Sequence, residues 1–230
     1  MSNRLDCIYN LIPKDSNGVA DIGTDHGLIP IRLIQEGYCH TVVASDLREG
    51  PLSKAIQAAE ELEISDRISF VLTNGLQGIN KYDIDTIVIA GMGGETITTI
   101  LDEDYWCCAP GYTLILQPMT QSQILRFWLI NNEFKISREF LKMDENKIYN
   151  VLLVEFGESP SYTDAELYTG KYEQIKENDL FPEYLDQIIH KFEVRVHGQS
   201  LSSNDTGDKN LNRTILTQLY DMKERFLHES

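Results

Sequence analysis

Short apolar runs alternate with helix-length segments through the first half of the chain, and this alternation constrains the fold more than any other feature. Five runs have the length and composition of strands: residues 19–22, 41–46, 68–72, 86–90 and 112–117. The fourth and fifth are almost continuously apolar, which is typical of parallel strands buried on both faces of a sheet. Strands separated by helices imply βαβ units with right-handed crossovers. The sequence therefore predicts an α/β fold with five parallel strands.

A different pattern follows the fifth run. A helical segment with Leu125, Trp128 and Leu129 on one side precedes two extended segments, 134–143 and 148–156, which the polar sequence Asp-Glu-Asn-Lys separates. Two extended segments with a short polar turn between them predict a β-hairpin. The sheet is therefore expected to contain five parallel strands and one antiparallel pair.

Helical periodicity replaces the strand pattern after a loop-like segment at 157–162. Apolar residues recur every three or four positions in two runs, Leu185, Ile189, Phe192 and Val196 and then Leu211, Ile215, Leu219, Met222 and Phe226. Such narrow stripes are typical of paired, coiled-coil-like helices. We predict a sheet-containing domain over residues 1–157 and a small C-terminal helical domain over residues 158–230. The stripes either join the helices to each other or form an arm that docks a large substrate or partner.

A glycine-bearing loop connects the first predicted strand to the following helix. It has the sequence Asp-Ile-Gly-Thr-Asp-His-Gly over residues 21–27, and Asp46 closes the second strand. Strand, glycine loop and helix in this order, with an acid after the next strand, form the crevice in which many α/β proteins bind nucleotides. Asp46 is expected to accept hydrogen bonds from ribose hydroxyls, and Gly23, His26 and Gly27 are expected to contact the same ligand.

Two acidic side chains in this loop distinguish between cofactors. Asp21 precedes the first glycine, and Asp25 stands where a dinucleotide-binding loop has its middle glycine, so both would repel a pyrophosphate. S-adenosylmethionine has no phosphate and carries a sulfonium and an ammonium, which carboxylates attract. The loop favours S-adenosylmethionine, and an NAD(P)-dependent oxidoreductase on the same sheet is the alternative. Either aspartate could instead cap the following helix.

Two further segments follow strands that end at the same edge of the sheet. Asn74 and Gly75 come after the third strand, where residues beside an adenine ring are expected, although this dipeptide also forms simple turns. Gly91, Met92 and Gly93 belong to the sequence Ala-Gly-Met-Gly-Gly, a predicted loop in which backbone can approach a ligand closely. We predict that both segments contact the cofactor.

Together these motifs resemble the bacterial TrmK family of tRNA (adenine-N1)-methyltransferases. The matching elements are Arg4-Leu5, DIGTDHG from residue 21, Asp46 with Gly50-Pro51, Asn74-Gly75, IAGMGGE from residue 89 and ILQP from residue 115. The resemblance implies a class I S-adenosylmethionine-dependent methyltransferase fold with a Rossmann-like sheet and coiled-coil-like C-terminal helices. It also implies methylation of N1 of adenosine 22 in tRNA. Three positions depart from the family pattern: Asp46 and Asn150 stand where a glutamate is common, and Met119 stands where an asparagine is usual.

The resemblance suggests roles for individual residues in the reaction. Adenine N1 is a neutral nucleophile that needs no deprotonation, so direct in-line displacement depends mainly on positioning. The methylated base becomes cationic, and Asp25 is expected to be catalytic because its carboxylate would stabilise that charge. Arg4, Arg32 and Arg126 are expected to contact the tRNA.

The charge of the chain limits how it can bind nucleic acid. Twenty Lys and Arg against 36 Asp and Glu give a net charge of -16, which excludes a histone-like binder. tRNA is therefore expected to meet a limited basic surface with modest, salt-sensitive affinity. The scattered cysteines and histidines and the lack of a leader or membrane-length apolar stretch predict no metal, no membrane association and a cytoplasmic location. A small-molecule methyltransferase and a non-catalytic scaffold are further alternatives.

Overall fold

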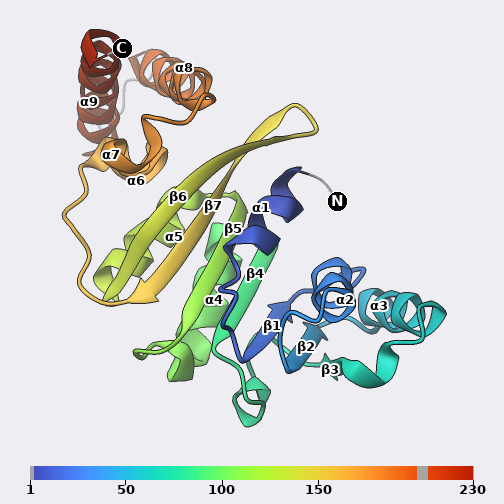
Figure 1. The fold of residues 1–230 in the computed structure, drawn as a ribbon. Helices are drawn as coiled ribbons and strands as arrows, with labels where there is room; N and C mark the ends of the chain where they lie inside the picture. The colour runs from blue at the N-terminus through green and yellow to red at the C-terminus, as the bar shows by residue number, and fades with distance from the viewer. Residues whose placement is uncertain (1–2, 201–206, 230) are drawn as a thin grey trace.

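The computed structural model describes residues 3–200 and 207–229. Within these residues the strands form one sheet in the order β3-β2-β1-β4-β5-β7-β6. They are β1 (Gly18–Ile22), β2 (Thr41–Asp46), β3 (Ser69–Leu72), β4 (Thr86–Gly93), β5 (Thr113–Thr120), β6 (Phe134–Asp144) and β7 (Lys147–Phe156). Strands β1 to β5 are parallel, and β7 is antiparallel to both β5 and β6. The predicted parallel strands and antiparallel hairpin are confirmed (Figure 1).

Helices cover both faces of the parallel part of the sheet (Figure 1). One face packs against α1 (Asn3–Leu11), α2 (Leu28–Gln35) and α3 (Glu49–Glu61), and the other against α4 (Gly94–Glu103) and α5 (Ser122–Asn131). Successive residues of β2 point to opposite faces: Val42 and Ala44 pack in the apolar cluster with α1, α2 and α3, and Val43 packs in the cluster with α4 and α5. The parallel strands are thus buried on both faces, which explains their apolar composition.

The C-terminal helices pack on the hairpin. They are α6 (Asp164–Thr169), α7 (Tyr172–Ile175), α8 (Phe181–Ser200) and α9 (Gly207–Glu229). Lys223 Nζ lies 2.7 Å from Asp186 Oδ1, and Tyr220 donates a hydrogen bond to Glu193, so α8 and α9 are antiparallel. Most residues of their predicted apolar stripes share one cluster with Leu141 of β6, whereas Val196 lies outside the cluster and Leu211 is exposed. The stripes therefore join the helices both to each other and to the hairpin. Among the described helices, none is long and apolar enough to cross a membrane.

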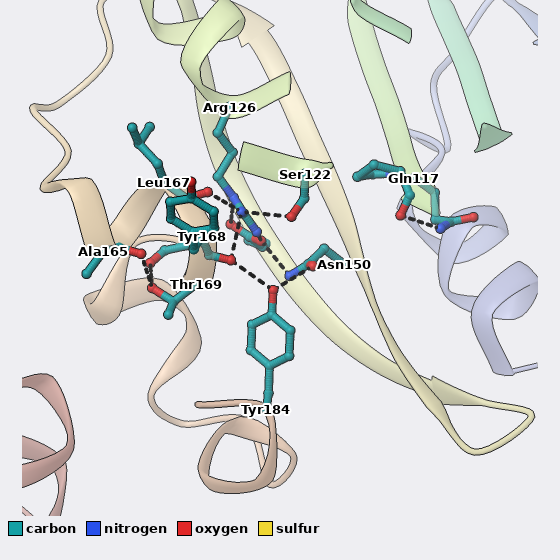
Figure 2. Close-up of polar contacts among 12 residues, drawn as sticks. Gln117, Ser122, Arg126, Asn150, Ala165, Leu167, Tyr168, Thr169 and Tyr184 are labelled. Carbon is teal, nitrogen blue, oxygen red and sulfur yellow. Dashed lines mark hydrogen bonds and ion pairs between the residues drawn. The ribbon is translucent and has the colours of Figure 1, made fainter. Parts of the chain in front are cut away.

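A buried polar network connects the C-terminal helices to the sheet (Figure 2). Arg126 of α5 pairs with Glu139 of β6, and its Nη1 donates to the carbonyl oxygen of Tyr168 at 3.2 Å. Glu139 also accepts a hydrogen bond from Asn150 Nδ2 at 2.9 Å. The Asn150 Oδ1 atom in turn accepts one from the Tyr184 hydroxyl of α8 at 2.8 Å. These bonds compensate the unfavourable desolvation of a buried ion pair.

The prediction that Arg126 contacts tRNA is therefore wrong. Its side chain is 0% exposed, and Glu139 offsets its charge inside the protein. Arginine is rarely buried without such a partner, so sequence reasoning places it on the surface by default. Glu139 lies on strand β6, and the sequence of helix α5 does not show that this strand packs beside Arg126.

Candidate active site

A cleft with a volume of ≈ 840 Å³ opens over the carboxyl ends of β1 to β4. Because β1 pairs with both β2 and β4, the winding of the sheet reverses there, which is where open α/β sheets form ligand crevices. The volume lies within the range of small-molecule sites, roughly 300–1,000 Å³. The predicted site residues that line it are Arg4, Asp21, Gly23, Asp25, His26, Asp46, Asn74, Gly75, Gly91 and Met92. Gly27 and Gly93 adjoin these residues without lining the cleft.

The turn between β1 and α2 forms one wall of the cleft. The backbone N–H groups of Gly23 and Thr24 donate to the Ser45 carbonyl at 2.8 and 2.9 Å, which ties the turn to the end of β2. Gly23 has a φ of +77°, and a Cβ there would lie 2.1 Å from Met92 Cε. Gly27 has a φ of +67° at the start of α2, where a Cβ would crowd α3. Gly23 thus shapes the cleft directly, and Gly27 acts through the packing of its helix.

Two buried aspartates stand at the ends of adjacent strands in this cleft. Asp21 of β1 and Asp46 of β2 both line it and are almost inaccessible to solvent. Burial raises the pKa of Asp21 to about 6, and the neighbouring Asp46 charge also raises it. The Asp46 Oδ1 atom accepts a hydrogen bond from the Arg48 backbone at 2.8 Å. Desolvated carboxylates of this kind favour a cationic ligand over an anionic one.

Asp25 and His26 lie in the exposed part of the same turn. Asp25 Oδ2 is 3.7 Å from His26 Nε2, and the two side chains are 64% and 53% exposed. Asp25 has a φ of +47°, in the left-handed region that residues other than glycine rarely adopt. Such conformations cluster at active sites. The Asp25 carboxylate can therefore contact a second molecule that enters the cleft.

One hydroxyl group in the wall lacks a hydrogen-bond partner within the described residues. It is Ser45 Oγ, a buried atom of a residue that lines the cleft. Unpaired buried hydroxyls are uncommon because their desolvation is unfavourable. A polar ligand in the cleft would supply a partner for it.

Helix α4 adds carboxylates that the sequence did not single out as site residues. Glu95 in its first turn and Glu103 at its end both line the cleft, and Asn74 Nδ2 donates to Glu103 Oε2 at 3.3 Å. Glu95 could have been predicted as a site residue because it directly follows the glycine segment. Nothing in the sequence around Glu103 indicates that it lines the cleft. With the three predicted aspartates, these side chains make the cleft acidic. No group of three or more His, Cys, Asp or Glu in the described ranges could hold a metal ion.

The other two arginines that were predicted to contact tRNA occupy different environments. Arg4 lines the cleft, and its side chain is only 18% exposed. Arg32 lies outside the cleft, where it donates to Asp6 at 2.7 Å and to Glu36 at 2.8 Å. Its guanidinium also lies 3.9 Å from the centre of the Tyr9 ring. These contacts link α1 to α2, and a role for Arg32 in tRNA binding remains a prediction.

A second, smaller groove adjoins the cleft. It has a volume of ≈ 300 Å³ and lies between the end of β5, strand β7 and helix α8. Met119 lines both cavities. Lys191 and Arg195, one helical turn apart on α8, line the groove together with Tyr149. Cationic and aromatic side chains in one groove are the groups that contact unpaired nucleotides.

The chain is similar to known methyltransferases over almost its whole length. A family model described as a methyltransferase domain matches residues 1–152. The tRNA (adenine(22)-N(1))-methyltransferase of Bacillus subtilis is 28% identical over 97% of this chain and 94% of its own. The crystal structure of the B. subtilis M1A22 tRNA methyltransferase TrmK has a TM-score of 0.81 at 26% identity, covering 99% of this chain and 97% of that one. Streptococcus pneumoniae Sp1610 in complex with S-adenosyl-L-methionine has a TM-score of 0.83 at 25% identity, covering 96% and 99%.

Proposed function

This chain belongs to the methyltransferase-domain family, and we propose that it transfers a methyl group from S-adenosylmethionine to N1 of adenosine 22 in tRNA. The observation that carries this proposal is the acidic cleft at the carboxyl ends of β1 to β4, with two buried aspartates at its base. Carboxylates there suit a cationic, phosphate-free nucleoside. The B. subtilis relative, which aligns with 97% of this chain, supports the choice of adenosine 22.

The residues of the cleft fit S-adenosylmethionine, which supplies a methyl group on a positively charged sulfur when it is bound. Asp21 presents a desolvated carboxylate to positive charge, and Asp46 presents one to ribose hydroxyls. Asn74 and Gly75 after β3 provide the wall for the adenine ring. The unpaired Ser45 hydroxyl of the cleft wall is a further donor and acceptor. The remaining residues that we assign to cofactor binding are Gly23, His26, Gly27, Gly91, Met92 and Gly93.

The acceptor side of the reaction requires positioning more than proton transfer. Adenine N1 attacks with its own lone pair, and the ring becomes cationic as the bond forms, so no base is needed. The exposed Asp25 carboxylate is placed to stabilise that developing charge. N1 takes part in base pairing and stacking inside folded RNA, so the nucleotide must leave the stack to reach the cleft.

The groove beside the cleft is the surface that we assign to the flanking RNA. Lys191 and Arg195, both exposed side chains that line the groove, would neutralise phosphates. Few cations serve this purpose in a chain with a net charge of -16, so binding is expected to be modest and to weaken with salt. A tRNA substrate also agrees with the cytoplasmic location inferred from the sequence.

Methyl transfer to unmodified tRNA tests the proposal. Purified protein, S-adenosylmethionine with a labelled methyl group and a tRNA transcript should give label in RNA, and mapping should place it at N1 of adenosine 22. The matched control is the same transcript with guanosine at position 22. Label at another base would replace the assigned target, and a lack of label across a tRNA pool would reject the function.

The alternatives predict different outcomes of simple measurements. An NAD(P)-dependent oxidoreductase would bind NADH more tightly than S-adenosylmethionine in a calorimetric titration. The acidic cleft disfavours that result, because its carboxylates would repel the pyrophosphate of NADH. A small-molecule methyltransferase would transfer the label without RNA. A non-catalytic scaffold would bind partners and transfer none.

A further inference from the structure

Strand β4 ends in a bulge at the cleft. Ala90 pairs with Gln117 and Met92 with Pro118, so Gly91 is the extra residue between them, with a φ of +78°. The extra residue of a bulge has no partner in the strand ladder. Here the Gly91 N–H donates to the Gln117 side chain, at 3.1 Å from Oε1. A side-chain amide from β5 thus replaces the backbone acceptor that the bulge removes.

The N-terminal helix holds this amide in place. Arg4 of α1 donates from Nη1 to the same Gln117 Oε1 atom, and its Nε lies 3.3 Å from Asp144 Oδ2 at the tip of β6. Its guanidinium lies 5.6 Å from the centre of the Tyr149 ring. Gln117 itself is fully buried, and its Nε2 donates to the Pro118 carbonyl at 3.0 Å. Two donors on one oxygen fix the orientation of the amide, because rotation would turn its NH₂ group toward both of them.

The bulge also contacts the opposite wall of the cleft. Met92 follows Gly91, and its methyl group occupies the space that a side chain at Gly23 would need. A displacement of the bulge would therefore change the distance between the end of β4 and the turn after β1. Both segments line the site at which the methyl group is transferred under the proposed function.

We propose that Arg4 is a positioning residue for methyl transfer, acting through Gln117 on the Gly91 bulge; the inference rests on the proposed function. Without the guanidinium, the Gln117 amide loses one of its two donors and the bulge loses a fixed acceptor. Displacing reacting groups by about 1 Å can lower a rate about 100-fold. A direct phosphate contact fits the structure less well, because the side chain is 18% exposed and already paired with Asp144.

The experiment compares Arg4→Ala, Arg4→Lys, Gln117→Leu and the double variant Arg4→Ala/Gln117→Leu. Arg67→Ala is the matched control, because Arg67 is exposed and lines neither the cleft nor the groove. We expect Arg4→Ala to lower kcat about 10- to 100-fold, with tRNA and cofactor affinities within about threefold. Arg4→Lys should recover part of kcat, because one ammonium donates to Gln117 without the fork that also reaches Asp144. The double variant should lose no more than the poorer single variant, because both act on one element.

Two further measurements separate positioning from other roles. Hydrogen exchange at the Gly91 amide should quicken in Arg4→Ala, and thermal melting checks that each variant is folded at the assay temperature. Gln117→Met removes the oxygen acceptor at similar side-chain volume and replaces Gln117→Leu if that variant does not fold. If wild-type protein fails to methylate tRNA, the proposed function fails, and the exchange measurement still decides whether Arg4 holds the bulge.

Three outcomes would overturn the inference. In the first, Arg4→Ala keeps its kcat while tRNA binding weakens and the salt slope falls by about 1, which indicates a phosphate contact. In the second, the two single-variant losses multiply in the double variant, so Arg4 acts independently of Gln117. In the third, Gly91 exchange is unchanged in Arg4→Ala.

Discussion

Replacing Asp21 by asparagine is expected to raise the stability of the folded protein and to lower the affinity of the cleft for a cationic ligand. Asp21 is 6% exposed, and burial raises its pKa to about 6 from an ordinary value of 3.8. Between about pH 4 and 6 the folded protein therefore holds a proton that the unfolded chain releases. Its contribution to stability is present at low pH and is lost as the pH rises through the folded-state pKa. A rise in the pKa from 3.8 to about 6 destabilises the folded protein by ~3 kcal/mol at neutral pH.

Asparagine keeps the shape of the side chain and cannot ionise. We expect Asp21→Asn to raise the free energy of unfolding by about 1–3 kcal/mol at pH 7, which for a chain of this size raises Tm by roughly 2–10 °C. The same change removes a buried charge opposite a cationic ligand, which typically costs about 2–5 kcal/mol. S-adenosylmethionine affinity should therefore fall about 100-fold while the protein becomes more stable.

Melting curves of both proteins from pH 4.5 to 7.5 test the first half of this prediction, and calorimetric titration with S-adenosylmethionine at pH 7.5 tests the second. The difference between the two proteins removes the titration of groups that they share. It should be smallest at pH 4.5, where about a third of the full difference is already present because that pH lies above the ordinary pKa of 3.8, and it should reach its full size above pH 6. Asp66→Asn, at an exposed site, is the matched control. Equal or lower stability of Asp21→Asn at pH 7 would refute the argument from burial, and unchanged affinity would refute the contact.

Three further predictions concern the acceptor side, the buried network and the groove. Asp25→Ala should keep cofactor affinity within a few-fold and lose at least about 100-fold in kcat, measured by single-turnover transfer; wild-type turnover would remove Asp25 from catalysis. Arg126→Met should lower the free energy of unfolding by about 3–5 kcal/mol in urea titrations, because it leaves Glu139 buried without its cation; an unchanged midpoint would contradict that burial. Lys191→Glu with Arg195→Glu should weaken tRNA binding and flatten its salt dependence without changing cofactor affinity, whereas equal tRNA affinity would place the RNA elsewhere.

The sheet could be predicted from the sequence because its strands are short, apolar and regularly spaced. Prediction from the sequence fails for helices that are very short and for strand segments that are rich in glycine. Helices α6 and α7 span six and four residues, too few for helical periodicity to show. The segment after residue 90 was predicted as a loop, yet Met92 and Gly93 pair with β5 as part of β4. Small residues have weak strand propensity, and the Gly91 bulge allows the pairing to continue.

The grouping of Asp21 and Asp46 in one cleft was predictable for a related reason. Asp21 and Asp46 follow from the chain order, since parallel strands end at the same edge of a sheet. The arginines did not follow, because their partners are distant in sequence. Arg4 and Gln117 are 113 positions apart, and Arg126 pairs with Glu139 on a separate element. Asn150, where the family usually has a glutamate, has a clear polar role that only the folded structure reveals.

The Arg126 network limits whether the C-terminal helical part of this protein can be removed or replaced. A chain cut after residue 157 would keep Arg126 and Glu139 and lose the Tyr168 carbonyl that the guanidinium contacts. It would also expose Leu141, which packs among the C-terminal helices. Grafting the helical part of a relative would require Asn150 and its partner Tyr184 to change together. The sequence pattern changes at residue 157, but buried contacts continue across that position. The residues on the two sides of it are therefore expected to change together during evolution.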